Sequence, residues 1–257
     1  MHRHEHAFVQ VGGRRIEVRT IAGEPGRPTL VFLHEGLGSV AMWRGFPARV
    51  AEETGCAAVV YSRYGYGASE PLAEPFGVDY MHREALESLP ALLATLGVER
   101  PLLVGHSDGA SIALLYAGSG RPVRGVVAMA PHVFVEEVSV RSIAAAKVAF
   151  ETTDLAAKLG RYHADARRTF YGWNDIWLHP DFRRWNIEAC LGAIGCPVLV
   201  IQGADDEYGT MAQVDAIAAQ VAGPCEVLRL ENCRHSPHRE QHERTLAAIA
   251  DFVRRHA

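Results

Sequence analysis

Hydrophobic residues fall into two patterns along this chain, short unbroken runs and longer stretches with helical spacing. The unbroken runs end at glycines or polar residues, which is typical of strands buried on both faces of a parallel sheet. They cover residues 29–33, 56–61, 101–105, 123–129, 197–203 and 225–230. Ahead of them, residues 7–11 and 14–20 flank Gly12-Gly13 and predict a β-hairpin.

The stretches between these runs repeat their apolar residues at the helical period. They predict helices over residues 42–53, 81–96, 111–117 and 241–254. In the second of these, Leu86, Leu89, Leu93 and Leu96 share one face, and Gly97 ends the helix. Strands that alternate with helices indicate the α/β class, with a mostly parallel sheet covered by helices on both faces.

Composition narrows the class of protein. A chain of 257 residues suits one large α/β domain or two small ones, and 48% hydrophobic with 22% charged residues excludes global disorder. The net charge of -4 argues against a nucleic-acid partner or a polybasic membrane patch. Apolar runs stay shorter than the roughly 18 residues that a membrane span needs, so we expect no membrane association.

The cysteines and the N-terminal residues bear on the compartment. The five cysteines are scattered and form no C-x-x-C pair, which argues against a disulfide framework or a zinc cage. Residues 1–11 are polar and contain no apolar segment typical of a signal peptide. We therefore expect a cytoplasmic protein.

The third unbroken run leads into a motif that carries chemistry, Gly105-His106-Ser107-Asp108-Gly109. This is G-x-S-x-G, which presents a nucleophilic serine when a strand precedes it and a helix follows it, as both do here. The flanking glycines permit a sharp turn, and the helix N-terminus directs amide groups toward developing negative charge. Ser107 is therefore the predicted nucleophile.

With this motif in its context, the chain resembles the α/β-hydrolase fold superfamily across almost its whole length. The strand-to-helix turn that carries Ser107, called the nucleophile elbow, is similar to that of small-ester hydrolases, enol-lactonases and meta-cleavage C–C hydrolases. The resemblance implies a mostly parallel sheet flanked by helices, with a helical cap inserted after the sixth strand. It also implies a small-molecule substrate and no metal or organic cofactor.

The resemblance places the general base in the loop after the last strand. Only His235 and His238 lie there, in residues 232–240. This loop resembles the family pattern G-x-G-H-x-x-x-x-E, with Glu240 as its glutamate, and the pattern selects His235. His106, inside the elbow, is expected to point into packing.

The resemblance also places an acid after the strand at residues 197–203. The loop there reads Gly203-Ala204-Asp205-Asp206-Glu207, and the family spacing G-x-x-D selects Asp206. Asp205 is the adjacent rival, and Glu136 and Glu137 are remoter alternatives. The chain order of Ser107, Asp206 and His235 is the family order.

The oxyanion hole is expected at the amides of Gly36 and Asp108. The segment His34-Glu35-Gly36-Leu37-Gly38 resembles the family's H-G-G-P-G loop, with Glu35 in place of the first glycine. A shifted loop would use the amide of Leu37 instead. Glu35 should repel an anionic substrate unless it is paired or turned away, and it either orients substrate or water or makes a structural hydrogen bond within the loop. Arg63 begins a segment similar to the family's R-G-x-G-x-S turn, whose role there is structural.

The expected domains are a hydrolase core over residues 1–134 and 190–257 and a helical cap over residues 135–189. The cap is rich in aromatic residues, and Trp173 and Trp177 are candidates to line the substrate pocket with Glu35 and Leu37. One of the cap arginines is a candidate clamp for a substrate carboxylate, although a solvated helix face suits most of them. They are Arg161, Arg167, Arg168, Arg183 and Arg184.

These features predict a serine hydrolase that cleaves an ester, lactone or similar acyl bond of a small apolar or aromatic substrate through an acyl-enzyme. The alternatives are a C–C bond hydrolase of the meta-cleavage type and a non-catalytic ligand-binding member of the fold. Dehalogenases and epoxide hydrolases of this fold use an aspartate nucleophile, whereas position 107 is serine. We expect a monomer or a homodimer.

Overall fold

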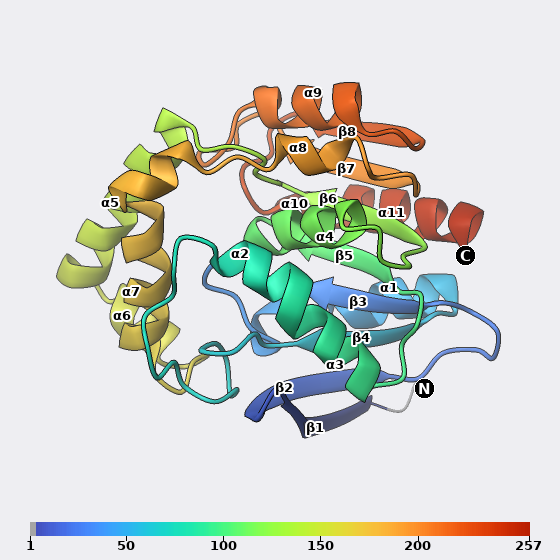
Figure 1. The fold of residues 1–257 in the computed structure, drawn as a ribbon, viewed down its shortest axis with the longest axis horizontal. Helices are drawn as coiled ribbons and strands as arrows, with labels where there is room; N and C mark the ends of the chain where they lie inside the picture. Colours follow the sequence, from blue (N-terminus) through green and yellow to red (C-terminus); the bar gives the residue numbers. More distant parts are fainter. Residues whose placement is uncertain (1–3) are drawn as a thin grey trace.

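An eight-stranded sheet runs through the computed structural model, which describes residues 4–257 (Figure 1). Its strands lie in the order β1-β2-β4-β3-β5-β6-β7-β8, with β1–β2 and β2–β4 antiparallel and all later pairs parallel. The mostly parallel α/β class is therefore confirmed. The strands are β1 (His4–Val11), β2 (Arg14–Ile21), β3 (Thr29–Leu33), β4 (Ala57–Tyr61), β5 (Leu102–His106), β6 (Gly125–Met129), β7 (Val198–Gly203) and β8 (Cys225–Leu230).

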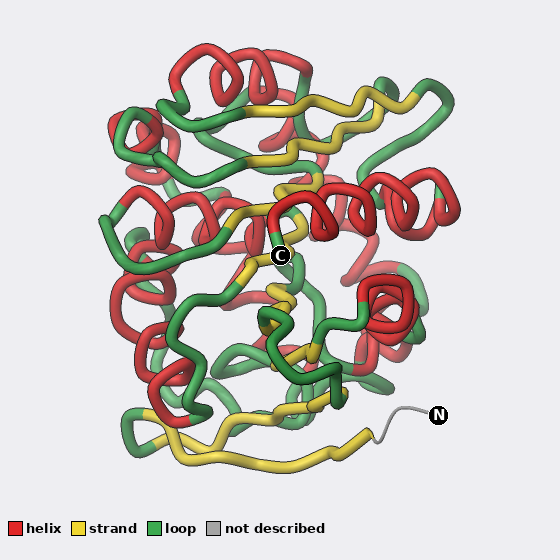
Figure 2. Tube along the Cα trace, turned by 90° about the vertical axis from the view of Figure 1, so that its right-hand side faces the viewer, coloured by secondary structure: helices red, strands yellow, loops and turns green. Residues whose placement is uncertain are grey.

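Helices cover both faces of the sheet, as Figure 2 shows along a view turned by 90°. Alternate residues of β3 serve the two faces, because successive side chains of a strand point to opposite sides. Val31 and Leu33 join one apolar cluster, and Leu30 and Phe32 join the other. The second cluster packs under α1 (Phe46–Thr54) and α11 (His242–His256), and the first packs under α3 (Leu89–Thr95) and α4 (Asp108–Gly118).

The described helical elements alternate with the strands and begin after β3. They are η1 (Ala41–Trp43), α1 (Phe46–Thr54), α2 (Tyr80–Arg83), η2 (Glu84–Ser88), α3 (Leu89–Thr95), α4 (Asp108–Gly118), α5 (Glu137–Thr152), α6 (Leu155–Leu159), α7 (Ala166–Trp177), η3 (Pro180–Arg184), α8 (Glu188–Leu191), α9 (Met211–Gln220), α10 (Pro237–Glu240) and α11 (His242–His256).

The predicted helix over residues 81–96 is divided by a π-helical turn. The π turn, η2, lies between α2 and α3, and its i→i+5 hydrogen bonds are wider than those of an α-helix. This shifts the phase of the helix, so Leu86 is 40% exposed while Leu89 and Leu93 are buried. The expectation that Leu86 shares their face is wrong for that reason.

Two further predictions need correction. The helix predicted over residues 42–53 is interrupted at Arg44, whose φ of 53° ends η1 before α1 begins. The run at residues 225–230 is a strand, but only Leu230 of β8 is buried, because β8 is an edge strand that pairs with β7 alone. By contrast the predicted hairpin is confirmed, with Gly12 and Gly13 both at positive φ in its turn.

The stretch between β6 and β7 is helical from α5 to α8, and α5, α6 and α7 gather to one side of the sheet (left in Figure 1). The division into core and cap stays a prediction, and its expected boundary at residue 189 falls inside α8. Residues 1–3 of the expected core lie outside the described residues. No helix within residues 4–257 is long and apolar enough to cross a membrane.

Candidate active site

Ser107 lies at the junction of β5 and α4 with an uncommon backbone conformation, φ 53° and ψ −120°. Such a conformation at a non-glycine residue costs on the order of 1–3 kcal/mol. The flanking glycines are required for space. A Cβ on Gly105 would lie 2.3 Å from the carbonyl oxygen of Gly109, and one on Gly109 would lie 2.1 Å from that of Leu33. The strained residue is therefore the serine itself, held by glycines that let the backbones approach.

Ser107, His235 and Asp206 form a continuous hydrogen-bonded series. The Ser107 hydroxyl lies 3.0 Å from Nε2 of His235, and Nδ1 of His235 lies 2.9 Å from both carboxylate oxygens of Asp206. Because a carboxylate only accepts, Nδ1 of His235 carries the proton and Nε2 is free to accept the one from Ser107. The structure thus brings together the three residues that the sequence motifs select.

Nearby charges and burial together set the pKa of His235. Burial lowers the pKa of His235, but its hydrogen bond to Asp206 and the negative charge of that carboxylate outweigh burial, so the pKa is raised above its ordinary value. Burial raises the pKa of Asp206, but the bond from His235 and the charge of that ring bring it below its ordinary value. Asp206 therefore stays ionised beside a histidine that is a stronger base than usual.

Other groups fix the carboxylate of Asp206 in place. It accepts hydrogen bonds from Nε2 of Gln202 at 2.8 Å and from the backbone N–H of Tyr208 at 2.8 Å. The rival Asp205 is exposed. The remoter alternatives serve elsewhere, since Glu136 binds Thr210 and Gln213, and Glu137 binds Arg183.

The loop that carries His235 is held by its own helix α10. The carboxylate of Glu240 accepts from the backbone N–H of Arg234 at 2.8 Å and from that of Ser236 at 3.2 Å. The glutamate of the sequence pattern therefore clamps the residues on either side of His235. The competing His238 is buried between Trp43 and Phe46 and makes no hydrogen bond to Ser107.

The loop after β3 is held from below by Arg63. Its buried guanidinium donates to the carbonyl oxygens of His34, at 2.6 Å, and Glu35, at 3.1 Å. Its backbone N–H donates to Nε2 of His34 at 3.0 Å. From the helical stretch above, Nε2 of His163 donates to the carbonyl of Leu37 at 2.9 Å. No sequence motif predicts this contact of His163.

A cavity of about 120 Å³ opens over Ser107. The four residues predicted to bind substrate, Glu35, Leu37, Trp173 and Trp177, all line it, and so do the predicted oxyanion residues Gly36 and Asp108. Gly36 lies so close to Trp173 that a Cβ there would be 2.1 Å from the indole nitrogen. As the first residue of α4, Asp108 has a backbone N–H without an intrahelical acceptor. The remaining lining residues are Ser107, His132, Ile143, Tyr208 and His235.

The two residues with carboxyl groups among the described lining of this cavity, Glu35 and Asp108, have no arginine or lysine beside them in that lining. The hypothesis that a cap arginine clamps a substrate there is not supported, because the five arginines lie outside it. Arg168 binds Leu72, for example, and Arg183 binds Glu137.

The side chain of Asp108 is buried in a polar network behind the nucleophile. Tyr80 donates its hydroxyl to Oδ2 of Asp108 at 2.5 Å, Trp177 donates to Tyr80 at 3.1 Å, and the Arg63 guanidinium lies 3.9 Å from Oδ2. Burial raises the pKa of Asp108 despite these partners. Oδ1 of Asp108 has no hydrogen-bond partner in the described chain. His132, also missed from the sequence, has its pKa lowered to about 3 by burial and by the nearby His235, so it is neutral.

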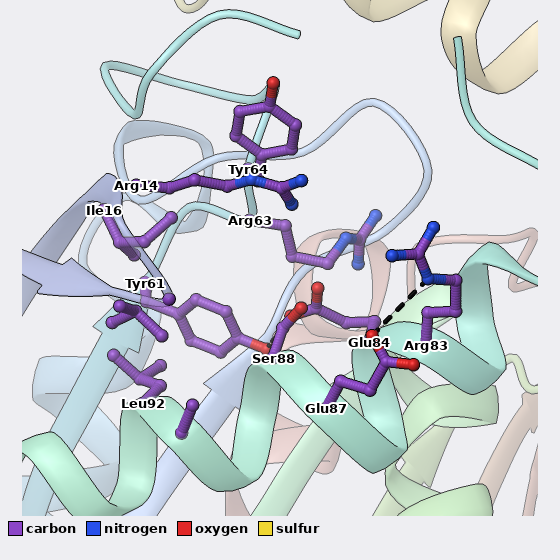
Figure 3. A pocket seen from close by; sticks show the side chains of 13 residues that line it. Arg14, Ile16, Tyr61, Arg63, Tyr64, Arg83, Glu84, Glu87, Ser88 and Leu92 are labelled. Atoms are coloured by element: carbon purple, nitrogen blue, oxygen red, sulfur yellow. Dashed lines mark hydrogen bonds and ion pairs between the residues drawn. The ribbon is translucent and has the colours of Figure 1, made fainter. Parts of the chain in front are cut away.

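A second cavity, of about 260 Å³, lies beside the hairpin and is shown in Figure 3. Its charged groups come from β2, from the segment after β4 and from the helices α2 and η2, and neither Ser107 nor His235 lines it. Tyr61 donates to Glu84 at 2.9 Å, and Arg83 lies 3.5 Å from Glu87. Within residues 4–257, no group of three or more His, Cys, Asp or Glu side chains is arranged to hold a metal ion.

The family follows from comparison with known proteins. Residues 30–248 match the model of the alpha/beta hydrolase family, and the chain belongs to that family. A 2-succinyl-6-hydroxy-2,4-cyclohexadiene-1-carboxylate synthase of Salmonella agona is 23% identical over 270 residues, covering 93% of this chain and 99% of the relative.

Solved structures share the fold. The enol-lactonase of Burkholderia xenovorans LB400 has a TM-score of 0.75 at 18% identity, covering 96% of this chain and 99% of that one. A carboxylesterase of Bacillus subtilis has a TM-score of 0.72 at 20% identity, covering 98% and 92%. These structures are similar to this chain in fold.

Proposed function

We propose that this chain is a serine hydrolase that cleaves an ester or lactone bond of a small, uncharged substrate through an acyl-enzyme. The observation that carries the proposal is the hydrogen-bonded series from Ser107 through His235 to Asp206. A serine hydroxyl is a weak nucleophile by itself, and this arrangement supplies both a base and the group that orients the base.

The proposed reaction has two halves. The oxygen of Ser107 attacks the substrate carbonyl carbon while its proton passes to Nε2 of His235, and the same proton is then delivered to the departing alkoxide. In the second half a water molecule attacks the acyl carbon while its proton passes to Nε2 of His235, which delivers that proton to the oxygen of Ser107 as the acid is released. The amides of Gly36 and Asp108 are the proposed donors to the oxyanion in both halves.

The shape and charge of the cavity support the proposed substrate class. A volume of about 120 Å³ is well below the 300–1,000 Å³ or so of pockets for drug-sized ligands. The walls include Trp173, Trp177 and Ile143, which suit an apolar acyl group. No arginine or lysine is among the described lining residues, so none of them would pair with an anionic acyl group.

This charge pattern separates the proposal from the curated relative. That relative is named for a molecule with succinyl and carboxylate groups, for which the described lining of the cavity offers no arginine or lysine partner. The enol-lactonase and the carboxylesterase are named for the bond types that we propose here. The cytoplasmic location and the state as monomer or homodimer remain predictions.

A labelling experiment and a substrate panel test the proposal together. A fluorophosphonate probe should label wild-type protein at Ser107, and Ser107→Ala should abolish both labelling and hydrolysis while the fold is retained. Ser119→Ala is the matched control, since Ser119 bonds only to Tyr116 at the far end of α4. A wild-type protein that neither reacts with the probe nor hydrolyses any substrate would instead indicate a ligand-binding member of the fold.

The panel should contain p-nitrophenyl acetate, butyrate and octanoate, an enol lactone, a vinylogous diketone and a p-nitrophenyl ester with a free carboxylate. We expect the acetate, the butyrate or the lactone to give the highest kcat/KM and the anionic ester the lowest. A clear preference for the diketone would replace ester hydrolysis with C–C bond hydrolysis. A preference for the anionic ester would contradict the uncharged substrate.

A further inference from the structure

His106, the residue directly before the nucleophile, contacts the base loop rather than serving only as packing. Its side chain is buried, and its Nε2 lies 2.7 Å from the backbone carbonyl oxygen of His235. Because a carbonyl only accepts, Nε2 of His106 carries a proton and donates it. The main chain of the proposed base is thus tied to the elbow by a side chain.

The other ring nitrogen of His106 faces a carboxylate. Nδ1 of His106 lies 3.6 Å from Oε2 of Glu35, and it has no hydrogen-bond partner in the described chain. The ring of His106 therefore reaches the carbonyl of His235 through Nε2 and faces the carboxylate of Glu35 through Nδ1.

The charged and titratable groups around His106 come from four segments, of which the one after β6 supplies His132. Glu35 follows β3, His235 lies in the loop after β8, and His238 and Arg239 belong to α10. Arg239 lies 3.5 Å from the other oxygen of Glu35. Burial raises the pKa of Glu35, but His106 and Arg239 outweigh burial and hold it well below its ordinary value, so Glu35 is ionised.

Glu35 also belongs to the loop of the proposed oxyanion donors. Its carbonyl oxygen accepts from Arg63, from the backbone N–H of Gly38 at 3.1 Å and from Nδ1 of His34 at 2.7 Å. The next residue is Gly36. A link from Glu35 through His106 to His235 therefore joins the donor loop, the elbow and the base loop, which follow β3, β5 and β8.

We propose that Glu35 and His106 act as a positioning pair that holds the backbone of His235 in register with the oxyanion loop. This inference rests on the proposed serine hydrolase function. Its rival is that Glu35, which lines the cavity, touches the substrate directly. The two readings differ in whether the effect of Glu35 requires His106.

A double-mutant cycle separates them. His106→Gln retains an amide donor near the carbonyl of His235 but has no nitrogen equivalent to Nδ1, so it breaks the pair with little change of volume. If the pair positions His235, Glu35→Ala should lower kcat about tenfold with KM within about twofold, and the same change in the His106→Gln background should add little. Effects that multiply in the double variant, or a rise in KM with unchanged kcat, would overturn the pair.

The isosteric Glu35→Gln adds a readout that loss of packing would not move. Its amide keeps the size of the carboxylate and can bond to Nδ1 of His106, so most of kcat should remain. The negative charge of Glu35 contributes to the raised pKa of His235, so its removal should move the acidic limb of the kcat/KM profile to lower pH. An unmoved limb together with a collapsed kcat would contradict this scheme.

Glu207→Gln is the matched control. Glu207 is a second carboxylate that raises the pKa of His235, but it pairs with Arg234 and does not contact His106. It should move the same limb and leave the kcat plateau intact. Labelling of wild-type Ser107 by the fluorophosphonate distinguishes the two levels of failure, since a labelled, active wild type with an additive cycle overturns only the positioning pair.

Discussion

Two of the cavities within residues 4–257 differ in a way that their volumes do not reveal. The larger, of about 260 Å³ beside the hairpin (Figure 3), has charged groups that are paired with one another. Tyr61 donates to Glu84, Arg83 lies near Glu87, and the Arg14 guanidinium stacks on Tyr64.

The smaller cavity, of about 120 Å³, is lined by residues with backbone strain or with polar atoms that have no hydrogen-bond partner in the described chain. Its floor is a serine in a strained backbone conformation, and Oδ1 of Asp108 and Nδ1 of His132 have no hydrogen-bond partners in the described chain. Unsatisfied buried polar atoms and backbone strain both cost stability, and proteins keep them mainly where chemistry needs them. Of the two cavities compared, the one over Ser107 is therefore the smaller, and it is the one with backbone strain and unpaired buried polar atoms.

The largest expected effect on kcat is at Asp206, the proposed acid that bonds to His235 of the smaller cavity. Asp206→Asn should lower kcat by about 10³-fold or more, because an amide does not stabilise the imidazolium of His235 and favours the wrong tautomer. Steady-state hydrolysis of p-nitrophenyl acetate measures it. The adjacent exposed carboxylate provides the control, and Asp205→Asn should stay within about twofold of wild type. The opposite pattern would assign the acid to Asp205.

Arg63 connects the two cavities, since it lines the larger one and supports the loop of the smaller. Arg63→Met should lower the free energy of unfolding by about 3–5 kcal/mol, because it leaves the buried Asp108 without its cation and two carbonyls without their donor. Urea denaturation measures this loss. Arg14→Met, at an exposed arginine that stacks on Tyr64, should cost less than about 1 kcal/mol. Equal losses would show that the cavities do not differ in this respect.

The pH dependence of kcat/KM depends on His235, which lines the smaller cavity. His235 must be unprotonated to accept the proton of Ser107, so kcat/KM should fall about tenfold per pH unit below the pKa of His235. Asp206 raises that pKa, so the acidic limb should lie above the ordinary histidine value of about 6.5. In Asp206→Asn the limb should move to lower pH. A limb below the ordinary value in wild type would contradict the electrostatic argument.

The smallest effect is expected in the larger cavity. Arg83 and Glu87 form an exposed pair, so Arg83→Ala should change the free energy of unfolding by no more than about 0.5 kcal/mol. Its kcat/KM should stay within about twofold of wild type. A loss of more than about tenfold would give the larger cavity a part in the reaction and erase the contrast between the two.

Much of the fold could be predicted because it depends on local pattern. Unbroken apolar runs located the parallel strands, and Gly12-Gly13 located the hairpin turn. The prediction was wrong at Leu86, where a π turn changed the phase of the helix, and at β8, where the run gave no sign of an edge position. A prediction from periodicity assumes that the helix is regular and that a strand has neighbours on both sides. A short apolar run contains no information on either point.

The same division applies to the candidate site. Ser107, Asp206 and His235 were selected because each follows a strand in a family motif, and parallel strands bring such loops to one edge of the sheet. No motif placed His132 at the cavity or Tyr80 against Asp108.

By itself, then, the sequence determined the element types, the elbow and the order of the three proposed catalytic residues, since these depend on neighbours along the chain. Only the tertiary structure decided which backbone carbonyl oxygens accept hydrogen bonds from His106, His163 and Arg63. The bond from His106 to His235 spans 129 residues, and that from His163 to Leu37 spans 126. Such contacts depend on strand order, sheet twist and helix packing, so they are fixed only when the whole core is assembled.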